Sequence, residues 1–156
     1  MDEFTEIKEA LLSIAKILGP DDISPEQVQI IDRGLPHSIG SLPKGKMAIY
    51  IFKYGDIYLK IGKVGTKSNA RFISQHYHPI SANSNLAKSI LADDEFGDNV
   101  SADTIKEWMM NNLNRIDILV NENLGIFALD LFEMCLHYKY KPKYEGFKKQ
   151  TYFKKN

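Results

Sequence analysis

The chain has 156 residues, of which 44% are hydrophobic and 26% are charged, a length and composition typical of one globular domain and too small for two. No apolar run approaches the about 20 residues of a transmembrane helix. Because 20 Lys and Arg balance 20 Asp and Glu, the net charge gives no information about binding partners. The single cysteine, Cys135, excludes an intramolecular disulfide and a cysteine zinc cluster. Because the N-terminal sequence lacks the basic and then apolar pattern of a signal peptide, we expect a cytoplasmic protein that does not bind membranes.

Two helices are predicted in the N-terminal part of the chain. Apolar residues recur every three or four positions from 3 to 18, which is typical of an amphipathic helix, and Gly19 with the following proline would end it. The segment Ser24-Pro25-Glu26-Gln27 has the pattern of a capping box, so a second, short helix is expected from 25 to about 33. Residues 35 to 46 contain two glycines and two prolines and are expected to form a loop.

Residues 47 to 63 are predicted to form a β-hairpin. A three-residue loop, Tyr54-Gly55-Asp56, would place Tyr50 opposite Lys60. It would also gather the apolar residues on one face of the hairpin, namely Met47, Ile49, Ile51, Ile57, Leu59 and Ile61. A two-residue loop would mix apolar and polar side chains on both faces, so we expect the three-residue loop, with Tyr50 and Lys60 as neighbours on the second face.

Three short helices are predicted after the hairpin. Ser68 is expected to cap one that carries Arg71, and a second is expected at 84 to 92. Ser101 is expected to cap a longer helix, whose apolar positions are Ile105, Trp108, Met109 and Leu113. The first two of these helices are short, and the third is better defined.

The sequence as a whole predicts an α/β fold, a three-stranded antiparallel sheet surrounded by helices. The third strand is indicated by alternating apolar residues from 116 to 120, and a last helix is predicted from 125 to 140. Residues 1–45 are expected to form a helical N-terminal extension, residues 46–147 the domain that contains the sheet, and residues 148–156 a basic C-terminal tail.

The predicted last helix carries a carboxylate within its apolar stripe. Glu133 lies on the same stripe as Ile126, Leu129, Leu136 and Tyr140. It either lies at the edge of the stripe and pairs with a lysine, or binds a hard divalent cation, for which a carboxylate oxygen is a suitable ligand.

Several polar residues around the hairpin have two interpretations. Tyr50 and Lys60 form either an ordinary cross-strand pair on a solvated face or part of a site. Arg71 is either a surface charge or, after a Gly62-Lys63-Val64-Gly65 turn, a phosphate ligand, although the spacing is not that of a phosphate-binding loop. His76 and the nearby His78 are either hydrogen-bonding residues or a proton-transfer or metal element.

In order and spacing, four of these elements resemble the motifs of the GIY-YIG endonuclease superfamily. They are the runs Ala48-Ile49-Tyr50 and Lys60-Ile61-Gly62-Lys63, then Arg71, and then Glu133 nine residues before Pro142. The resemblance covers about residues 46 to 146 and is nearest to small bacterial members that are mostly uncharacterised. Four positions depart from the pattern. Ala48 replaces the first glycine, and Lys60 stands where the family has its second tyrosine. Glu145 stands where many members have an asparagine, and His76 falls one position beyond the place of a helper His or Tyr in some members.

The resemblance implies a divalent-metal-dependent endonuclease that hydrolyses DNA phosphodiester bonds. Glu133 would bind a single Mg²⁺ or Mn²⁺, and Tyr50 would take the proton from the attacking water. Arg71 would neutralise the scissile phosphate, while Lys60 would stabilise the tyrosinate or contact the phosphate. His76 would assist the reaction, since some members carry a helper His or Tyr near this position.

The nucleic-acid contacts implied by the resemblance are Lys63, Ser68, Arg71 and Tyr77. DNA is the expected substrate, and RNA or branched DNA is the alternative. A second interpretation is a catalytically inactive nucleic-acid-binding or protein-binding module with the same fold. The balanced charge and the lack of a recognisable accessory DNA-binding domain favour this second interpretation.

Overall fold

The computed structural model of the chain describes residues 3–19, 23–80, 86–96 and 100–144. Its sheet has four strands, one more than expected, and all neighbouring strands are antiparallel, in the order β1-β4-β2-β3. The strands are β1 (Val28–Asp32), β2 (Lys46–Tyr54), β3 (Ile57–Val64) and β4 (Asn114–Asn121). β2 and β4 therefore lie in the centre of the sheet, and β3 forms one of its edges.

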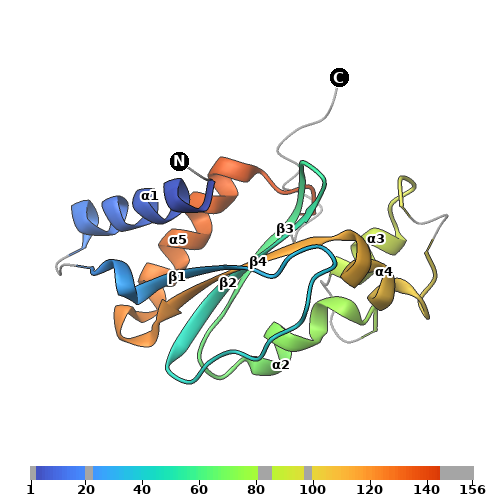
Figure 1. Cartoon of the computed structure of the whole chain (residues 1–156), viewed down its shortest axis with the longest axis horizontal. Helices are drawn as coiled ribbons and strands as arrows, with labels where there is room; N and C mark the ends of the chain where they lie inside the picture. The colour runs from blue at the N-terminus through green and yellow to red at the C-terminus, as the bar shows by residue number, and fades with distance from the viewer. Residues whose placement is uncertain (1–2, 20–22, 81–85, 97–99, 145–156) are drawn as a thin grey trace.

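Helices cover both faces of the sheet (Figure 1). One face, here called the α1/α5 face, packs against α1 (Glu3–Leu18) and α5 (Gly125–Tyr140). The other, here called the α2/α4 face, packs against α2 (Asn69–Ile73), η2 (Gln75–Tyr77), α3 (Leu86–Leu91) and α4 (Ile105–Asn112). Short turns of 3₁₀-helix, η1 (Pro25–Gln27) and η4 (Glu122–Leu124), precede β1 and α5. Among the described residues, no helix has both the length and the apolar character needed to cross a membrane.

The expected helix from 25 to 33 is wrong beyond its first turn. The capping interaction is present, since the Ser24 backbone N–H donates to Oε1 of Gln27 at 2.9 Å, but the helix ends at Gln27. Residues 28–32 form strand β1, which pairs with β4 along its whole length. Val, Ile and Ile in five residues suit a strand, and the ladder with β4 outweighs the helical start. The expected N-terminal extension thus supplies an edge strand to the sheet.

The β2–β3 hairpin has a different turn from the one expected. Tyr54 pairs directly with Ile57, so the loop consists of Gly55 and Asp56 alone. Gly55 has a φ of +55°, which a glycine adopts without a steric penalty. The three-residue loop predicted from the apolar pattern is therefore wrong.

A bulge next to this turn sets the register of the rest of the hairpin. The register shifts between Phe52 and Lys53, after which Phe52 pairs with Lys60 and Tyr50 pairs with Gly62. The extra residue in β3 is Leu59, which consequently packs on the face of Tyr50 and Phe52. A bulge adds one residue to one strand and so reconciles a tight turn with a consistent apolar face, which neither simple register does.

The remaining predicted helices are present with small changes at their ends. The first and last predicted helices coincide with α1 and α5, and α3 lies within the expected range of 84 to 92. α4 begins at Ile105 with Thr104 at its N-cap, so Ser101 does not cap it. The expected basic tail, residues 148–156, lies outside the described residues.

The outer edge of β3 is covered by the C-terminal part of the described chain. The Tyr58 carbonyl accepts a hydrogen bond from the Lys143 N–H, and the Leu59 carbonyl accepts one from the Tyr144 N–H, both at 2.8 Å. Nε2 of His137, on α5, lies 3.2 Å from the carbonyl oxygen of Ile61. α5 therefore lies along this edge, where it brings its side chains close to those of β3.

Candidate functional site

The side chain of Tyr50 lies across Gly62 of the neighbouring strand. A Cβ atom at Gly62 would lie 2.6 Å from Cζ of Tyr50, closer than Cβ atoms approach other atoms in proteins. Only glycine therefore leaves room for the tyrosine ring at this position of β3. The ring extends over the edge strand, and its hydroxyl makes no hydrogen bond of standard geometry with any described residue. Tyr50 as a whole is fully buried.

Three charged side chains act on the Tyr50 hydroxyl, namely Arg71, Glu133 and, more weakly, Arg115. Burial raises the pKa of this phenol, the Arg71 guanidinium on α2 is the strongest influence that lowers it, and the Glu133 carboxylate on α5 raises it further. The net pKa is above the ordinary value of 10.0, so Tyr50 is neutral at pH 7. An arginine and a carboxylate from two different helices thus come within electrostatic reach of one buried phenol.

His76 lies beside Tyr50 on the α2/α4 face. The centroids of the two rings are 4.5 Å apart, and His76 is 2% exposed. Burial, together with the charges of Lys60, Arg71 and Arg115, lowers the pKa of His76 to about 3. Neither ring nitrogen has a hydrogen-bond partner among the described residues. His76 is therefore a neutral imidazole next to Tyr50, with one ring nitrogen that can donate a hydrogen bond and one that can accept a hydrogen bond.

Lys60 lies on the same face as Tyr50, as expected, although the register differs. Because Lys60 pairs with Phe52 and Gly62 pairs with Tyr50, the two side chains occupy successive positions of one face. Lys60 is only 6% exposed, and its charge lowers the pKa of His76. Arg71 is the cation whose charge acts most strongly on Tyr50, and the expected role of Lys60 in stabilising the tyrosinate or contacting the phosphate stays a prediction.

Glu133 and Lys63 form an ion pair where α5 meets β3. Nζ of Lys63 lies 2.6 Å from Oε2 of Glu133 and 2.9 Å from Oδ1 of Asp130. Partial burial lowers the pKa of Lys63, but the hydrogen bonds with Glu133 and Asp130 outweigh it and raise the pKa above 10.5. Glu133 thus pairs with a lysine, one of its two interpretations, and Lys63 neutralises carboxylates in this structure instead of pointing to solvent.

Asp130 is a site residue that the sequence reasoning missed. It precedes Glu133 by three positions on α5, so the two carboxylates project from one side of the helix. The signal in the sequence is this three-residue spacing of two carboxylates, whereas the apolar stripe indicates Glu133 alone. The described residues contain no group of three or more His, Cys, Asp and Glu that could hold a metal ion. Carboxylate oxygens nevertheless suit Mg²⁺ or Mn²⁺, and the position of the Lys63 ammonium shows that a positive charge is favourable between them.

The expected phosphate-binding turn after the hairpin is absent. Strand β3 includes Gly62, Lys63 and Val64, which pair with β2, and it ends directly before Gly65. α2 then begins at Asn69, with Ser68 at its N-cap. The Ser68 side chain makes no capping hydrogen bond with α2. Its expected contact with nucleic acid stays a prediction.

Tyr77, an expected nucleic-acid contact, is instead an interior residue. It is 1% exposed, and its hydroxyl accepts a hydrogen bond from Nη1 of Arg115 at 3.0 Å. The same hydroxyl lies 2.9 Å from Nε2 of His37. Nδ1 of His37 lies 2.5 Å from the Leu113 carbonyl, which can only accept, so Nδ1 carries the proton and Nε2 accepts from Tyr77. This buried network excludes a contact between Tyr77 and nucleic acid in this conformation.

No family model, no curated protein and no solved structure matches the chain. The functional inference therefore depends on the short motifs and on the side chains around β3. Of the expected site residues, Tyr50, Lys60, Arg71 and His76 gather on the α2/α4 face, and Glu133 acts on Tyr50 from α5.

Proposed function

We propose that the protein is a divalent-metal-dependent endonuclease that hydrolyses DNA phosphodiester bonds at the β3 edge of the sheet. The observation that supports this proposal most strongly is the environment of Tyr50. It is a buried phenol without a standard hydrogen bond, held over Gly62 and acted on by a guanidinium and a carboxylate. These are the tyrosine, arginine and glutamate to which the GIY-YIG resemblance assigns the chemistry.

Arg71 and Tyr50 would act on opposite sides of the reaction. The exposed Arg71 guanidinium can contact two oxygens of one phosphate through its planar fork and stabilise the charge that develops there. Tyr50 can accept a proton from water only as the phenolate, because the neutral phenol is a very weak base. Since its pKa is raised, the rate is expected to increase with pH through the alkaline range. His76 is uncharged at neutral pH, and with a pKa of about 3 it is too weak a base to take the phenol proton, so its place beside Tyr50 suits a hydrogen bond within the site.

Glu133 and Asp130 would hold the divalent cation, since Glu133 acts on Tyr50 and both carboxylates already share one positive charge, the Lys63 ammonium. When bound, such a cation neutralises charge on the phosphate and lowers the pKa of a water molecule. Lys63 would then be displaced from the two carboxylates. Its ammonium, on a flexible side chain at the edge of the site, would become available to a phosphate oxygen.

The alternative is a catalytically inactive binding module with the same fold. One observation favours it: the Lys63 ammonium already neutralises Glu133 and Asp130. A chain with no net charge also lacks a general attraction for nucleic acid. In this case the protein would bind a nucleic acid or a protein without changing it.

Incubation with substrates separates the two functions. Purified protein is mixed with supercoiled plasmid, branched DNA or RNA, with Mg²⁺, with Mn²⁺ or with a chelator, and the products are separated on gels. The nuclease is expected to nick or cleave DNA only when the metal is present. Binding in a mobility-shift assay without cleavage under any of these conditions would establish the binding module instead.

Matched variants assign the activity to this site. Tyr50→Phe and Glu133→Gln are each expected to reduce cleavage by about 100-fold or more, the scale of losing one preorganised electrostatic group. The controls are Tyr138→Phe, at a residue on α5 that is 83% exposed, and Glu95→Gln, whose side chain is 54% exposed. Equal activity of Glu133→Gln and Glu95→Gln would show that Glu133 is not a metal ligand.

A further inference from the structure

Arg115 is a buried arginine that binds three separate parts of the molecule. It lies in the central strand β4 and is 1% exposed. Its Nε donates to Oδ1 of Asp117 at 2.9 Å, its Nη1 to the Tyr77 hydroxyl at 3.0 Å, and its Nη2 to the Phe72 carbonyl at 2.9 Å. Each of the three guanidinium nitrogens thus has its own partner.

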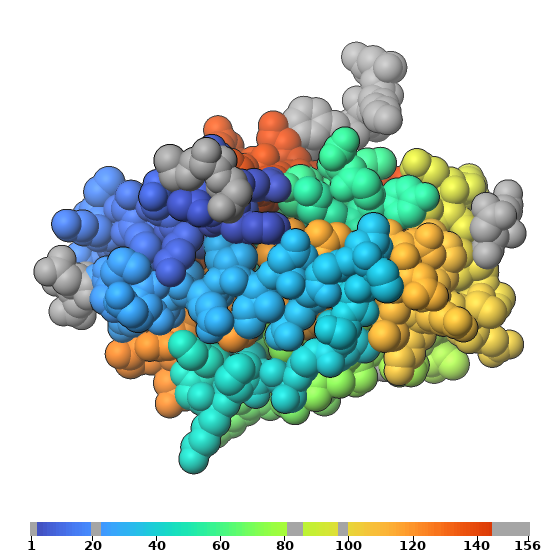
Figure 2. All heavy atoms as spheres, viewed as in Figure 1, coloured from blue at the N-terminus to red at the C-terminus, as the bar shows by residue number. Residues whose placement is uncertain are grey.

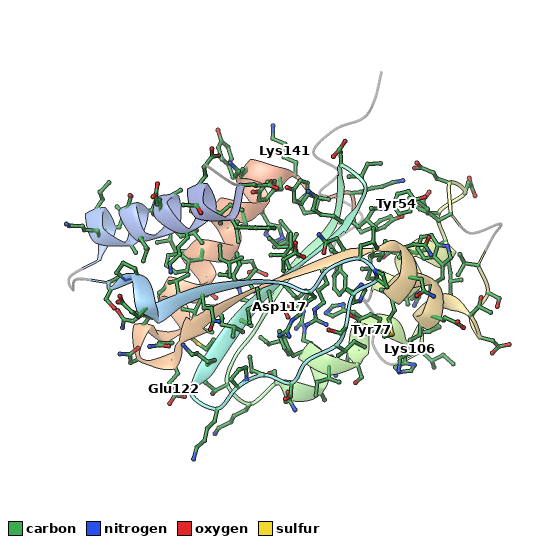
Figure 3. The ribbon with its side chains drawn as sticks, in the orientation of Figure 1. Tyr54, Tyr77, Lys106, Asp117, Glu122 and Lys141 are labelled. Carbon is green, nitrogen blue, oxygen red and sulfur yellow. The ribbon has the colours of Figure 1, made fainter. Side chains whose placement is uncertain are left out.

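Asp117 fixes the direction of this guanidinium. It is fully buried, and its second oxygen, Oδ2, accepts a hydrogen bond from Nε of Arg33 at 2.7 Å. Both carboxylate oxygens are therefore occupied, and the aspartate cannot rotate without losing a charged hydrogen bond. Figure 3 labels Asp117 on the sheet and Tyr77 beside it on the α2 side. Arg115 donates a hydrogen bond to each of these two residues.

The partners of Arg115 are sequence neighbours of two candidate site residues. Phe72 directly follows Arg71 in α2, and Tyr77 directly follows His76 in η2. The Arg115 guanidinium also lies 4.6 Å from the centre of the Phe72 ring. One side chain from the central strand thus holds both short helical segments that carry the basic and imidazole groups of the site.

α2 cannot keep this orientation by itself. It has five residues, and its N-cap residue, Ser68, makes no side-chain capping hydrogen bond. A helix this short is unstable without tertiary contacts, because nucleation costs more than its few hydrogen bonds return. Tertiary contacts therefore set its position: the Leu42 N–H donates to Oδ1 of Asn69 at its first residue at 2.9 Å, and the buried Phe72 and the hydrogen bond from Arg115 to the Phe72 carbonyl hold its centre.

We infer that Arg115, oriented by Asp117, is a positioning residue that fixes Arg71 and His76 relative to Tyr50. The role assigned to Arg71 and His76 rests on the proposed function, whereas the fixing of the segment does not. A lysine at position 115 would keep the charge but offer a single ammonium, which cannot reach three partners in the plane of a guanidinium. The inference therefore predicts that Arg115→Lys releases the segment from Arg71 to Tyr77.

The first test measures amide hydrogen exchange and needs no activity. In Arg115→Lys, amides in residues 69–77 are expected to exchange about tenfold faster than in the parent, while amides of α5 keep their rates, because only the local opening becomes easier. Tyr77→Phe is a milder second variant, which removes a single hydroxyl and should accelerate exchange in η2 alone. The inference would be overturned if both variants kept the parent exchange rates in residues 69–77. It would also be overturned if in both variants the exchange rates of α5 increased as much as those of residues 69–77.

The second test measures cleavage in single turnover. Arg115→Lys is expected to reduce the rate about tenfold or more with unchanged DNA affinity, and to cause no further loss in an Arg71→Lys background, because the two residues act through one group. Independent, additive losses would overturn the positioning role. If the parent protein cleaves no nucleic acid, the proposed function fails, and the exchange measurement still decides whether Arg115 fixes the segment.

Discussion

The two faces of the sheet are both buried, but they are built from different residues. The buried strand residues of the α1/α5 face are aliphatic or Met: Val28, Met47, Ile49, Ile51, Ile61, Ile116, Ile118 and Val120. The buried polar and charged residues of the described chain lie on the other side: His37, Lys60, His76, Arg115 and Asp117. β4 shows the contrast residue by residue, since Ile116 and Ile118 alternate with Arg115 and Asp117.

The two faces contribute to the structure in different ways. Apolar contacts on the α1/α5 face are not directional, so they stabilise the fold without fixing the angle of any one side chain. Buried charges on the α2/α4 face are costly to desolvate and are stable only when their hydrogen bonds are made. They therefore contribute less net stability than the same area of aliphatic residues, but they impose a definite geometry on α2 and η2.

The segment after β1 helps to cover the α2/α4 face, and Figure 2 shows it on the surface of the molecule. Its blue-to-cyan atoms run along the viewed face beside the orange atoms of α4. The His37 N–H donates to the Met110 carbonyl at 2.9 Å, and the Arg33 N–H donates to the Arg115 carbonyl at 2.8 Å. The loop is thereby tied to α4 and β4, and it closes the polar network from outside.

The largest expected effect compares two neighbours in β4 that point to opposite faces. Asp117→Asn removes the charge between two arginines and is expected to lower the free energy of unfolding by about 3 to 5 kcal/mol, as for other broken buried ion pairs. Ile118→Val, on the apolar face, should cost only about 1 kcal/mol. Urea denaturation of both variants measures the difference. Similar losses would mean that the buried charges are solvated or rearranged.

A second comparison uses two glycines at the end of the hairpin. Gly62→Ala forces the Tyr50 ring to move and is expected to destabilise the protein by about 2 kcal/mol, the usual scale of overpacking. Gly65→Ala has no atom within 4 Å of the new Cβ and should change stability by less than about 0.5 kcal/mol. Thermal denaturation and tyrosine absorbance test the pair. Equal stability of the two variants would mean that Tyr50 does not lie over Gly62.

The buried histidines should make the protein sensitive to acid. Burial lowers the pKa of His76 from 6.5 to about 3 and also lowers that of His37. Below pH 6.5 the unfolded chain therefore binds protons that the folded state does not, and stability is lost as the pH falls, by at most about 1.4 kcal/mol per pH unit for each histidine. His76→Phe should flatten this dependence between pH 7 and 5. Identical slopes for parent and His76→Phe would contradict a buried neutral imidazole.

The smallest effect on stability is expected where the two faces meet at the edge of β3. Lys63→Met removes an ion pair whose lysine side chain is 34% exposed, so the free energy of unfolding should change by less than about 1 kcal/mol. The same substitution should alter Mn²⁺ binding, measured by calorimetry, because it frees the Glu133 and Asp130 oxygens. A stability loss as large as that of Asp117→Asn would place this pair with the buried network instead of at the surface.

Local sequence determined the elements whose pattern repeats over several turns. The amphipathic stripe of residues 3–18, ended by Gly19, defines α1 to the residue, and a run of helix-compatible residues from 125 to 140, stopped before Pro142, defines α5. The alternation from 116 to 120 identified β4. Tyr50, Arg71 and Glu133 were singled out by motif spacing, and the structure brings them within electrostatic reach of one another.

Only the tertiary structure decided the fourth strand, the hairpin bulge and the buried charges. β1 follows a helical start, and only its ladder with β4 makes it a strand. The bulge at Leu59 depends on a competition between turn geometry and packing that no single strand reveals. Arg115 and Asp117 alternate with isoleucines, a pattern that resembles a solvated face, and they are buried because α2, η2 and the loop after β1 supply their partners from distant parts of the chain. A polar residue can be buried only where such partners converge, and that convergence is a property of the folded chain.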